Sequence, residues 1–91
     1  MIRLNVFIQV EEKNRVAVLD IAKKLVSASL ADEGCIAYDI FESSTRKDVL
    51  MICETWKDEA TLAAHGKKTH FTTLVPEIEA LAKMKIEQFP F

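Results

Sequence analysis

Strict alternation of apolar and polar residues over positions 2–10 constrains the fold of this chain more than any other feature of its sequence. Every even-numbered position in the segment is aliphatic: Ile2, Leu4, Val6, Ile8 and Val10. Because successive side chains of a strand point to opposite faces, this spacing places all five on one face. The segment is therefore predicted to be a β-strand with one face on a core.

The segment after this strand has apolar residues at helical spacing. Beyond the polar residues 11–14, apolar residues recur three or four positions apart, at Val18, Ile21, Ala22, Leu25 and Ala28. This spacing predicts an amphipathic helix. Asn14 is expected to cap its beginning, and Gly34 lies just beyond its end.

Two further alternating segments, 35–42 and 49–56, are separated by the polar residues 43–48. This arrangement predicts an antiparallel hairpin, in which Ile36, Tyr38 and Ile40 are expected to share a face.

The last third of the chain contains two helical patterns and a closing strand. Asp58 is a suitable N-cap for a short helix that ends at Gly66. A second helical pattern begins near Thr69, with Pro76 expected in or near its first turns. Its apolar positions are Phe71, Leu74, Val75, Ile78, Leu81 and Ala82. A short strand containing Met84, Ile86 and Phe89 is expected to close the chain.

The order β, α, β, β, α, β is typical of the ferredoxin-like split β-α-β sandwich, an α+β fold with helices on one face of a four-stranded antiparallel sheet. The chain has 91 residues, of which 49% are hydrophobic and 29% charged. This is enough to bury one modest core, so residues 1–91 are expected to form a single domain.

The other face of the predicted sheet is also largely apolar. It would carry Phe7, Ala37, Phe41, Val49, Met51 and Cys53. A sheet face open to water normally reads polar, so a second layer is expected. No segment of the 91 residues remains to form that layer, which predicts a homodimer through a two-fold contact between sheets.

Charge and composition exclude several classes of protein. The net charge of −2 leaves no basic patch for nucleic acid. No apolar run is long enough to span a membrane, and the N-terminus lacks the features of a signal peptide, so a cytoplasmic protein is expected. Cys35 and Cys53 are too few for a disulfide framework and are expected to be reduced. With two glycines, no glycine-rich nucleotide loop is possible.

Glu54 is in phase with Leu50, Ile52 and Trp56, which would place a carboxylate on an apolar face. A buried carboxylate needs a partner or a chemical role. The alternative is that Glu54 pairs with a lysine at the end of the strand and is structural.

His65 and His70 lie five residues apart across Gly66. Imidazole exchanges protons near neutral pH, so the pair are candidates for general acid and base. Alternatively, each caps a helix end. A metal site is not expected, because two imidazoles without a third ligand at ligand spacing do not complete one.

Trp56, Phe71 and Tyr38 can line a pocket for a flat substrate, although aromatic residues at such spacing also form ordinary cores. Asn5, on the first strand, can orient a ligand carbonyl, unless its face forms the dimer interface.

Several short motifs occur together and in order: Gly34-Cys35, Tyr38, Glu54-x-Trp56, Asp58-x-Ala60, Leu62-x-x-His65 and His70-Phe71. With these motifs, nearly the whole chain resembles the antibiotic biosynthesis monooxygenase domain family, which includes quinol monooxygenases. The resemblance implies a dimeric ferredoxin-like protein that oxidises quinol-like or polyketide-like aromatics with O2. No metal or flavin cofactor is implied, since the substrate anion supplies the electron.

By this resemblance, His65 or His70 would be the catalytic base and Asn5 a hydrogen-bond donor to the oxyanion. Tyr38, Trp56 and Phe71 would be walls of a water-excluding pocket, with Glu54 at its border. Haem-degrading relatives carry a tryptophan on the short helix where this chain has His65, so haem degradation is not expected. The family also includes an isomerase and members of no known activity. The alternative function is therefore a non-oxidative isomerase, or a small-molecule-binding or stress-response protein without catalysis.

Overall fold

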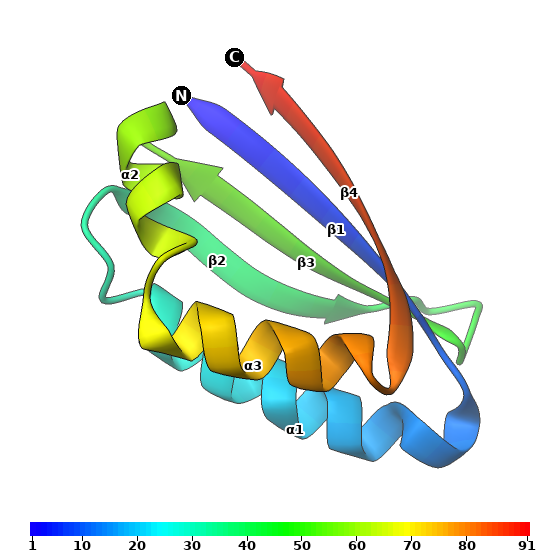
Figure 1. Cartoon of the computed structure of the whole chain (residues 1–91). Coiled ribbons are helices and arrows are strands. Elements are labelled where there is room, and N and C mark those ends of the chain that lie inside the picture. The colour runs from blue at the N-terminus through cyan, green and yellow to red at the C-terminus, as the bar shows by residue number, and fades with distance from the viewer.

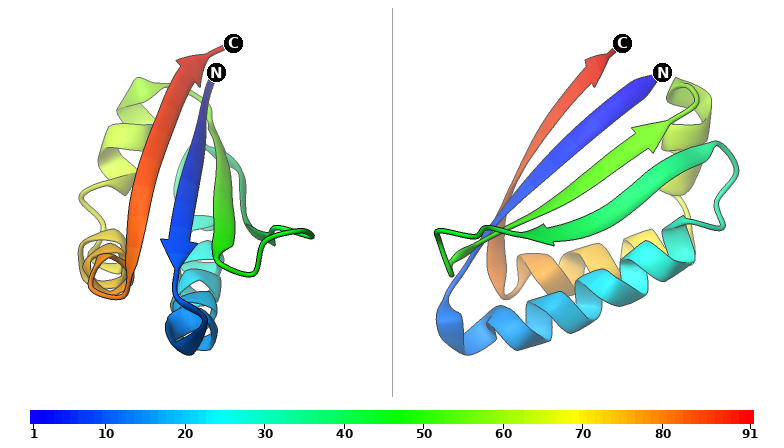
Figure 2. Two further views of the ribbon diagram at one scale, coloured as in Figure 1. Left: turned by 90° about the vertical axis from the view of Figure 1, so that its right-hand side faces the viewer. Right: turned by 180° about the vertical axis from the view of Figure 1, so that it is seen from behind.

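Four antiparallel strands form one sheet in the order β2-β3-β1-β4, and three helices lie on one side of it (Figures 1 and 2). The computed structural model describes all 91 residues. The elements in chain order are β1 (Ile2–Val10), α1 (Glu12–Ser29), β2 (Cys35–Glu42), β3 (Val49–Trp56), α2 (Glu59–His65), α3 (Thr69–Glu79) and β4 (Ala82–Pro90). The predicted α+β ferredoxin-like fold is therefore confirmed. None of the helices combines the length and the apolar composition needed to cross a membrane.

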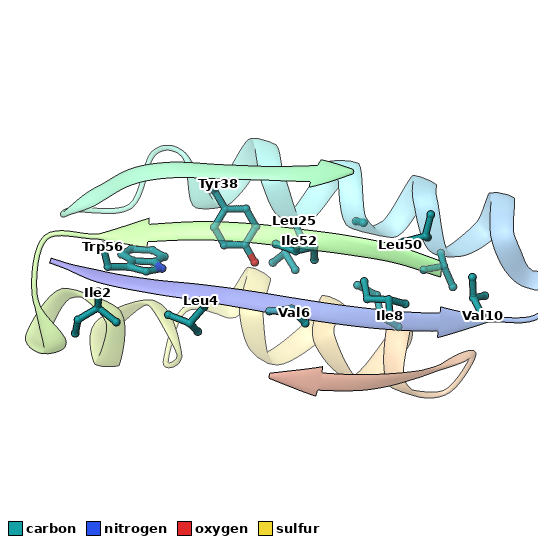
Figure 3. Close-up of a cluster of buried hydrophobic side chains, with 13 residues drawn as sticks. Ile2, Leu4, Val6, Ile8, Val10, Leu25, Tyr38, Leu50, Ile52 and Trp56 are labelled. Atoms are coloured by element: carbon teal, nitrogen blue, oxygen red, sulfur yellow. The ribbon is translucent and has the colours of Figure 1, made fainter. Parts of the chain in front are cut away.

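β1 lies in the middle of the sheet, between β3 and β4. Its five aliphatic side chains are at most 7% exposed, and Figure 3 shows them in a row beside the side chains of β3. The register places Leu4 opposite Glu54, and Ile8 opposite Leu50. The alternation of β1 thus decides which residues of β3 face the helices.

The first helix begins earlier than predicted. α1 starts at Glu12, and Glu11 occupies the capping position without a side-chain hydrogen bond. The prediction of Asn14 as the N-cap is therefore wrong. Asn14 Nδ2 instead donates to the carbonyl oxygen of Leu81, at 3.4 Å, and so ties the first turn of α1 to the α3–β4 connection.

The last helix ends earlier than its apolar pattern indicated. α3 stops at Glu79, and Ala82 already begins the nine-residue β4, which is longer than predicted. Leu81 and Ala82 nevertheless pack against the core, so their spacing reflects burial and not helical structure. Pro76 lies in the second half of α3, not in its first turns. Its missing N–H removes one hydrogen bond of the helix.

A β-bulge interrupts the alternation of β2. Cys35 pairs with Trp56 and Ala37 with Thr55, which leaves Ile36 without a partner. Ile36 is 54% exposed, whereas Tyr38 is buried. The prediction that Ile36 and Tyr38 share a face is therefore wrong, because a bulge changes the phase of the side chains.

The sheet face away from the helices carries a row of three large apolar side chains. Phe7 lies opposite Met51, which lies opposite Phe41. Phe7 is 38% and Phe41 49% exposed. On β4 the same face carries Lys83, Lys85 and Glu87. These residues pair with Gln9, Phe7 and Asn5 of β1, respectively. The same face also carries Arg3, Asn5, Gln9 and Asp39. The predicted apolar character is therefore limited to the middle of β1, β2 and β3, and β4 is charged there except at Phe89.

The connection from α1 to β2 requires glycine at position 34. Gly34 has a φ of 78°, and a Cβ at this position would overlap the side chain of Thr61 in α2. The carbonyl oxygen of Gly34 also accepts a hydrogen bond from Lys57 N–H at 2.8 Å. This turn is therefore fixed against the beginning of α2.

We expect Gly34→Ala to destabilise the fold by about 1–2 kcal/mol from backbone strain alone, with a further loss from the contact with Thr61. Gly66→Ala is the matched control. Gly66 has a φ of −62°, and its added Cβ would come no closer than 3.5 Å to a neighbouring atom outside the adjacent residues. Urea unfolding followed by circular dichroism measures both. Equal stability of Gly34→Ala and wild type would contradict this explanation of the turn.

Candidate active site

A mostly apolar cavity of about 230 Å³ lies between the sheet and the second and third helices. Its polar side chains come from three strands and one helix: Tyr38, Glu54, Gln88 and His65. The apolar lining includes Leu4, Val6, Ile52, Leu62, Phe71, Val75 and Ile86. A larger hollow of about 530 Å³ lies around Gln9, Asn14 and Lys83, but it contains none of the predicted site residues.

His65 ends α2 and is 1% exposed. Its ring lies among aromatic residues, with centroids 4.5 Å from Trp56, 5.2 Å from Phe71 and 5.6 Å from Tyr38. Nδ1 is 2.7 Å from Asp32 Oδ2, whereas Nε2 is buried and has no hydrogen-bond partner. Burial lowers the pKa of His65, against the opposing effect of the Asp32 carboxylate. This favours a neutral imidazole.

His70 has a different position from His65, although both contact the same carboxylate. It lies in the first turn of α3, and its Nε2 is 2.8 Å from Asp32 Oδ2. His70 is not among the residues that line the cavity. The structure therefore brings the two predicted histidines together but places only His65 against the cavity.

Asp32, in the turn after α1, was not predicted from the sequence. Its side chain is 7% exposed and contacts both histidines through one oxygen. Burial raises the pKa of Asp32, but the hydrogen bonds from His65 and His70 outweigh this effect, and the net pKa lies below its usual value. Nothing in the sequence distinguishes Asp32 from Glu33, which is exposed.

Asp32, His65 and His70 have ligand atoms within 4.8 Å of one another, and such a set can hold a divalent cation. The sequence-based argument against a metal site, which depended on the lack of a third ligand, is therefore wrong. In the structure, hydrogen bonds join the Asp32 oxygen to one nitrogen of each imidazole. These bonds satisfy the three atoms without a metal.

Glu54 is a buried carboxyl group, 5% exposed, in the floor of the cavity. Its Oε1 accepts a hydrogen bond from Trp56 Nε1 at 2.8 Å, so the alternative of a lysine partner is wrong. Burial raises the pKa of Glu54 to about 7, although Trp56 and Tyr38 act in the opposite direction. Glu54 can therefore accept or release a proton near neutral pH.

The other predicted residues lie on both sides of the sheet. Tyr38 and Phe71 line the cavity. Trp56 is fully buried and does not line the cavity; its ring packs against His65 and its N–H binds Glu54. Asn5 lies on the opposite face, where Cys53 Sγ donates to its Oδ1 at 3.6 Å. The prediction that Asn5 lies with the pocket residues is therefore wrong, because Asn5 is on the other side of the sheet of the same chain.

This α+β sandwich is the fold of a known class of small proteins. Residues 1–77 match the model of the antibiotic biosynthesis monooxygenase family, and the chain belongs to this family.

Individual relatives agree with this assignment. The chain is 33% identical over 87 residues to YcnE of Bacillus subtilis (strain 168), a protein provisionally named a monooxygenase. The match covers 96% of this chain and 92% of YcnE. It is 58% identical to a crystallised Bacteroides thetaiotaomicron VPI-5482 protein of unknown function, suggested to be an oxidoreductase. The TM-score is 0.98, with 99% of this chain and 96% of that chain covered.

A more distant structure shares the fold alone. SnoaB, a cofactor-independent oxygenase from Streptomyces nogalater, superimposes with a TM-score of 0.90 at 9% identity, in its N63A mutant form. The match covers 99% of this chain and 91% of SnoaB.

The raised pKa of Glu54 predicts a pH-dependent difference in stability between wild type and Glu54→Gln. Burial raises the folded-state pKa from 4.5 to about 7, so the folded protein holds its proton more tightly than the unfolded chain. The resulting stability is present below pH 4.5 and is lost as the pH rises through 7. Glu54→Gln has no carboxyl group at this position, so it does not lose this stability as the pH rises. Its stability relative to wild type should therefore increase by about 3 kcal/mol from pH 4.5 to pH 8.

Urea unfolding of both proteins across this pH range measures the difference. Glu77→Gln, at an exposed position of α3, is the control and should follow wild type throughout. A constant gap between Glu54→Gln and wild type would show that Glu54 has no raised pKa.

Proposed function

We propose that this protein is a cofactor-independent monooxygenase that oxidises small quinol-like aromatics with O2. The observation that carries the proposal is the unpartnered, buried Nε2 of His65, a residue that lines a mostly apolar cavity. A buried imidazole nitrogen without a partner is able to accept a proton from a bound hydroxyl group. The other ring nitrogen contacts Asp32, so the ring has a defined orientation.

The reaction needs a substrate anion in a site without water. His65 Nε2 takes the proton of a hydroxyl group, and the anion transfers one electron to O2. The resulting substrate radical and superoxide combine, which forms a carbon–oxygen bond. The O–O bond then breaks together with the C–H bond at the same carbon, whose electron pair forms the new carbonyl group. The outer oxygen leaves as water, and its two protons balance the one lost from that carbon and the one taken by His65. For a hydroquinone, the products are a hydroxyquinone and one water, so each O2 gives one oxygen atom to the substrate.

The other polar groups of the cavity suit the protons of this reaction. Burial raises the pKa of Tyr38, so its hydroxyl stays protonated and can donate a hydrogen bond to an oxyanion. Glu54, with a pKa of about 7, can deliver a proton to the departing oxygen. Phe71 and the aliphatic lining exclude water, which would stabilise the anion and slow electron transfer.

The size of the cavity favours a small substrate. Its volume of about 230 Å³ lies below the roughly 300–1,000 Å³ of pockets for drug-sized ligands. A substrate of one or two rings is therefore favoured over a polyketide with several fused rings. SnoaB shows that the shared fold can support oxidation without a cofactor, but the residues of this cavity carry the present proposal.

The alternative, an isomerase, is favoured by the presence of two proton-exchanging groups in one cavity. His65 and Glu54 both line it, and together they can move a proton between two carbons without consuming O2. Oxygen uptake separates the two functions.

We expect EDTA-treated wild-type protein to consume O2 with one- and two-ring hydroquinones, measured with an oxygen electrode. His65→Ala should lower the rate by about 100-fold or more, because a positioned base contributes 10²–10⁴-fold. His70→Ala should lower it less, since His70 does not line the cavity. Lys67→Ala, an exposed position between the two histidines, is the control and should match wild type.

Several results would contradict the proposal. These are no oxygen uptake by wild type across the panel, full activity of His65→Ala, or activity that EDTA abolishes and one divalent metal restores.

We also propose that the protein acts as a homodimer through the face of the sheet opposite the cavity. Phe7, Met51 and Phe41 form the apolar row on this face, and Phe7 and Phe41 are exposed. Phe89 of β4 is 41% exposed on the same face. Burial of apolar area is favourable at roughly 25 cal/mol per Å². A two-fold contact would bring the same row of a second chain onto the first.

Gel filtration with light scattering should give twice the 10.3 kDa mass of one chain. Phe41→Asp, which places a charge in the apolar row, should shift the protein toward the monomer. Val16→Asp is the control, because Val16 is 71% exposed on α1, away from this face. A monomeric wild type, or equal masses for Phe41→Asp and wild type, would contradict the proposed interface.

A further inference from the structure

Asp32 contacts both histidines through a single carboxylate oxygen. Oδ2 is 2.7 Å from His65 Nδ1 and 2.8 Å from His70 Nε2. An ionised carboxylate oxygen accepts hydrogen bonds and donates none, so each nitrogen that contacts it must carry a hydrogen. The geometry therefore assigns one hydrogen to Nδ1 of His65 and one to Nε2 of His70.

This assignment determines the state of the second nitrogen of His65. A neutral imidazole carries only one ring hydrogen. With that hydrogen on Nδ1, the Nε2 atom has a free lone pair. Nε2 is buried and meets no donor from the protein, and His65 lines the cavity. A ligand hydroxyl group in the cavity is then the available partner for Nε2.

We propose that Asp32 is the positioning residue of the site, which holds His65 in the Nδ1–H tautomer and thereby makes Nε2 a proton acceptor toward the cavity. The inference rests on the proposed role of His65 as the base. Asp32 acts through His65 and does not itself line the cavity. His70 is the second donor to Asp32, and its part is to hold the carboxylate in place.

The fold holds Asp32 in position by its backbone. Asp32 N–H donates to the carbonyl oxygen of Ser29 at 3.0 Å, and the carbonyl oxygen of Asp32 accepts from Cys35 N–H at 3.1 Å. The nearby Gly34 is packed against Thr61 of α2. The carboxylate is thus fixed where the end of α2 and the beginning of α3 meet the α1–β2 turn.

The alternative tautomer would remove the function of the site. If His65 carried its hydrogen on Nε2, then Nδ1 and the Asp32 oxygen would be two acceptors 2.7 Å apart, which repel each other. Nε2–H would also be a donor, unable to take a proton from a substrate. Loss of Asp32 removes the interaction that prevents this tautomer.

The tautomer can be measured directly on the free protein. Long-range ¹H–¹⁵N correlation NMR of EDTA-treated, ¹⁵N-histidine-labelled wild type at neutral pH should show His65 with a protonated Nδ1 and an unprotonated Nε2. A His65 ring with its hydrogen on Nε2, or doubly protonated, would overturn the proposal. No substrate is needed, so a protein with the expected tautomer but no oxygen uptake would contradict only the proposed oxidation.

Variants test whether Asp32 causes the tautomer. In Asp32→Ala, the Nε2–H form of His65 should become the major one, and oxygen uptake should fall by about 100-fold, as expected for loss of a positioned base. Glu33→Ala is the control, because Glu33 is exposed in the same turn and carries the same charge. It should keep both the tautomer and the activity.

An unchanged His65 tautomer in folded Asp32→Ala would overturn the positioning role. If Asp32→Ala does not fold, the wild-type spectrum still decides the assignment of the hydrogens.

Discussion

The one-sided burial of β1 is the constraint on which the rest of the structure depends. Its five aliphatic side chains are at most 7% exposed, and the strand pairs with β3 on one side and β4 on the other. A shift of one residue in either pairing would turn the aliphatic set away from the helices. This register places Glu54 on the helix side of the sheet and Asn5 on the other, and so separates the cavity from the apolar row.

The cavity has polar groups where stability alone would favour apolar ones. Glu54 is buried with a raised pKa, and His65 has a buried nitrogen without a partner. Both features cost free energy in the unliganded protein. Departures of this kind from good packing are expected at functional sites. The apolar row on the opposite face is a second departure, and a partner chain would satisfy it.

Local periodicity predicted the elements of this fold well, because alternation and helical spacing follow directly from burial. It failed where a tertiary contact decides the structure. Asn14 suits a helix cap by composition but binds Leu81, and Leu81 fits a helical period although it packs from a turn. The bulge at Ile36 depends on the pairing of β2 with β3 and has no signal in the sequence of β2 alone.

The same limit applies to the site. His65 and Glu54 could be identified as candidates from their residue type, and Tyr38 and Phe71 could be identified because they are aromatic. Asp32 could not, since it lies 33 and 38 residues from the histidines that it contacts. Its neighbour Glu33 offers the same chemistry, and only the path of the turn decides which carboxylate is buried.

The most direct test of the central claim, that chemistry takes place in the cavity beneath the helices, is a crystal structure with a two-ring hydroquinone bound under anaerobic conditions. We predict one substrate hydroxyl oxygen at about 2.6–3.2 Å from His65 Nε2, with the rings between Tyr38 and Phe71. A ligand bound on the opposite face of the sheet, or one in the cavity with no contact to His65, would contradict this account.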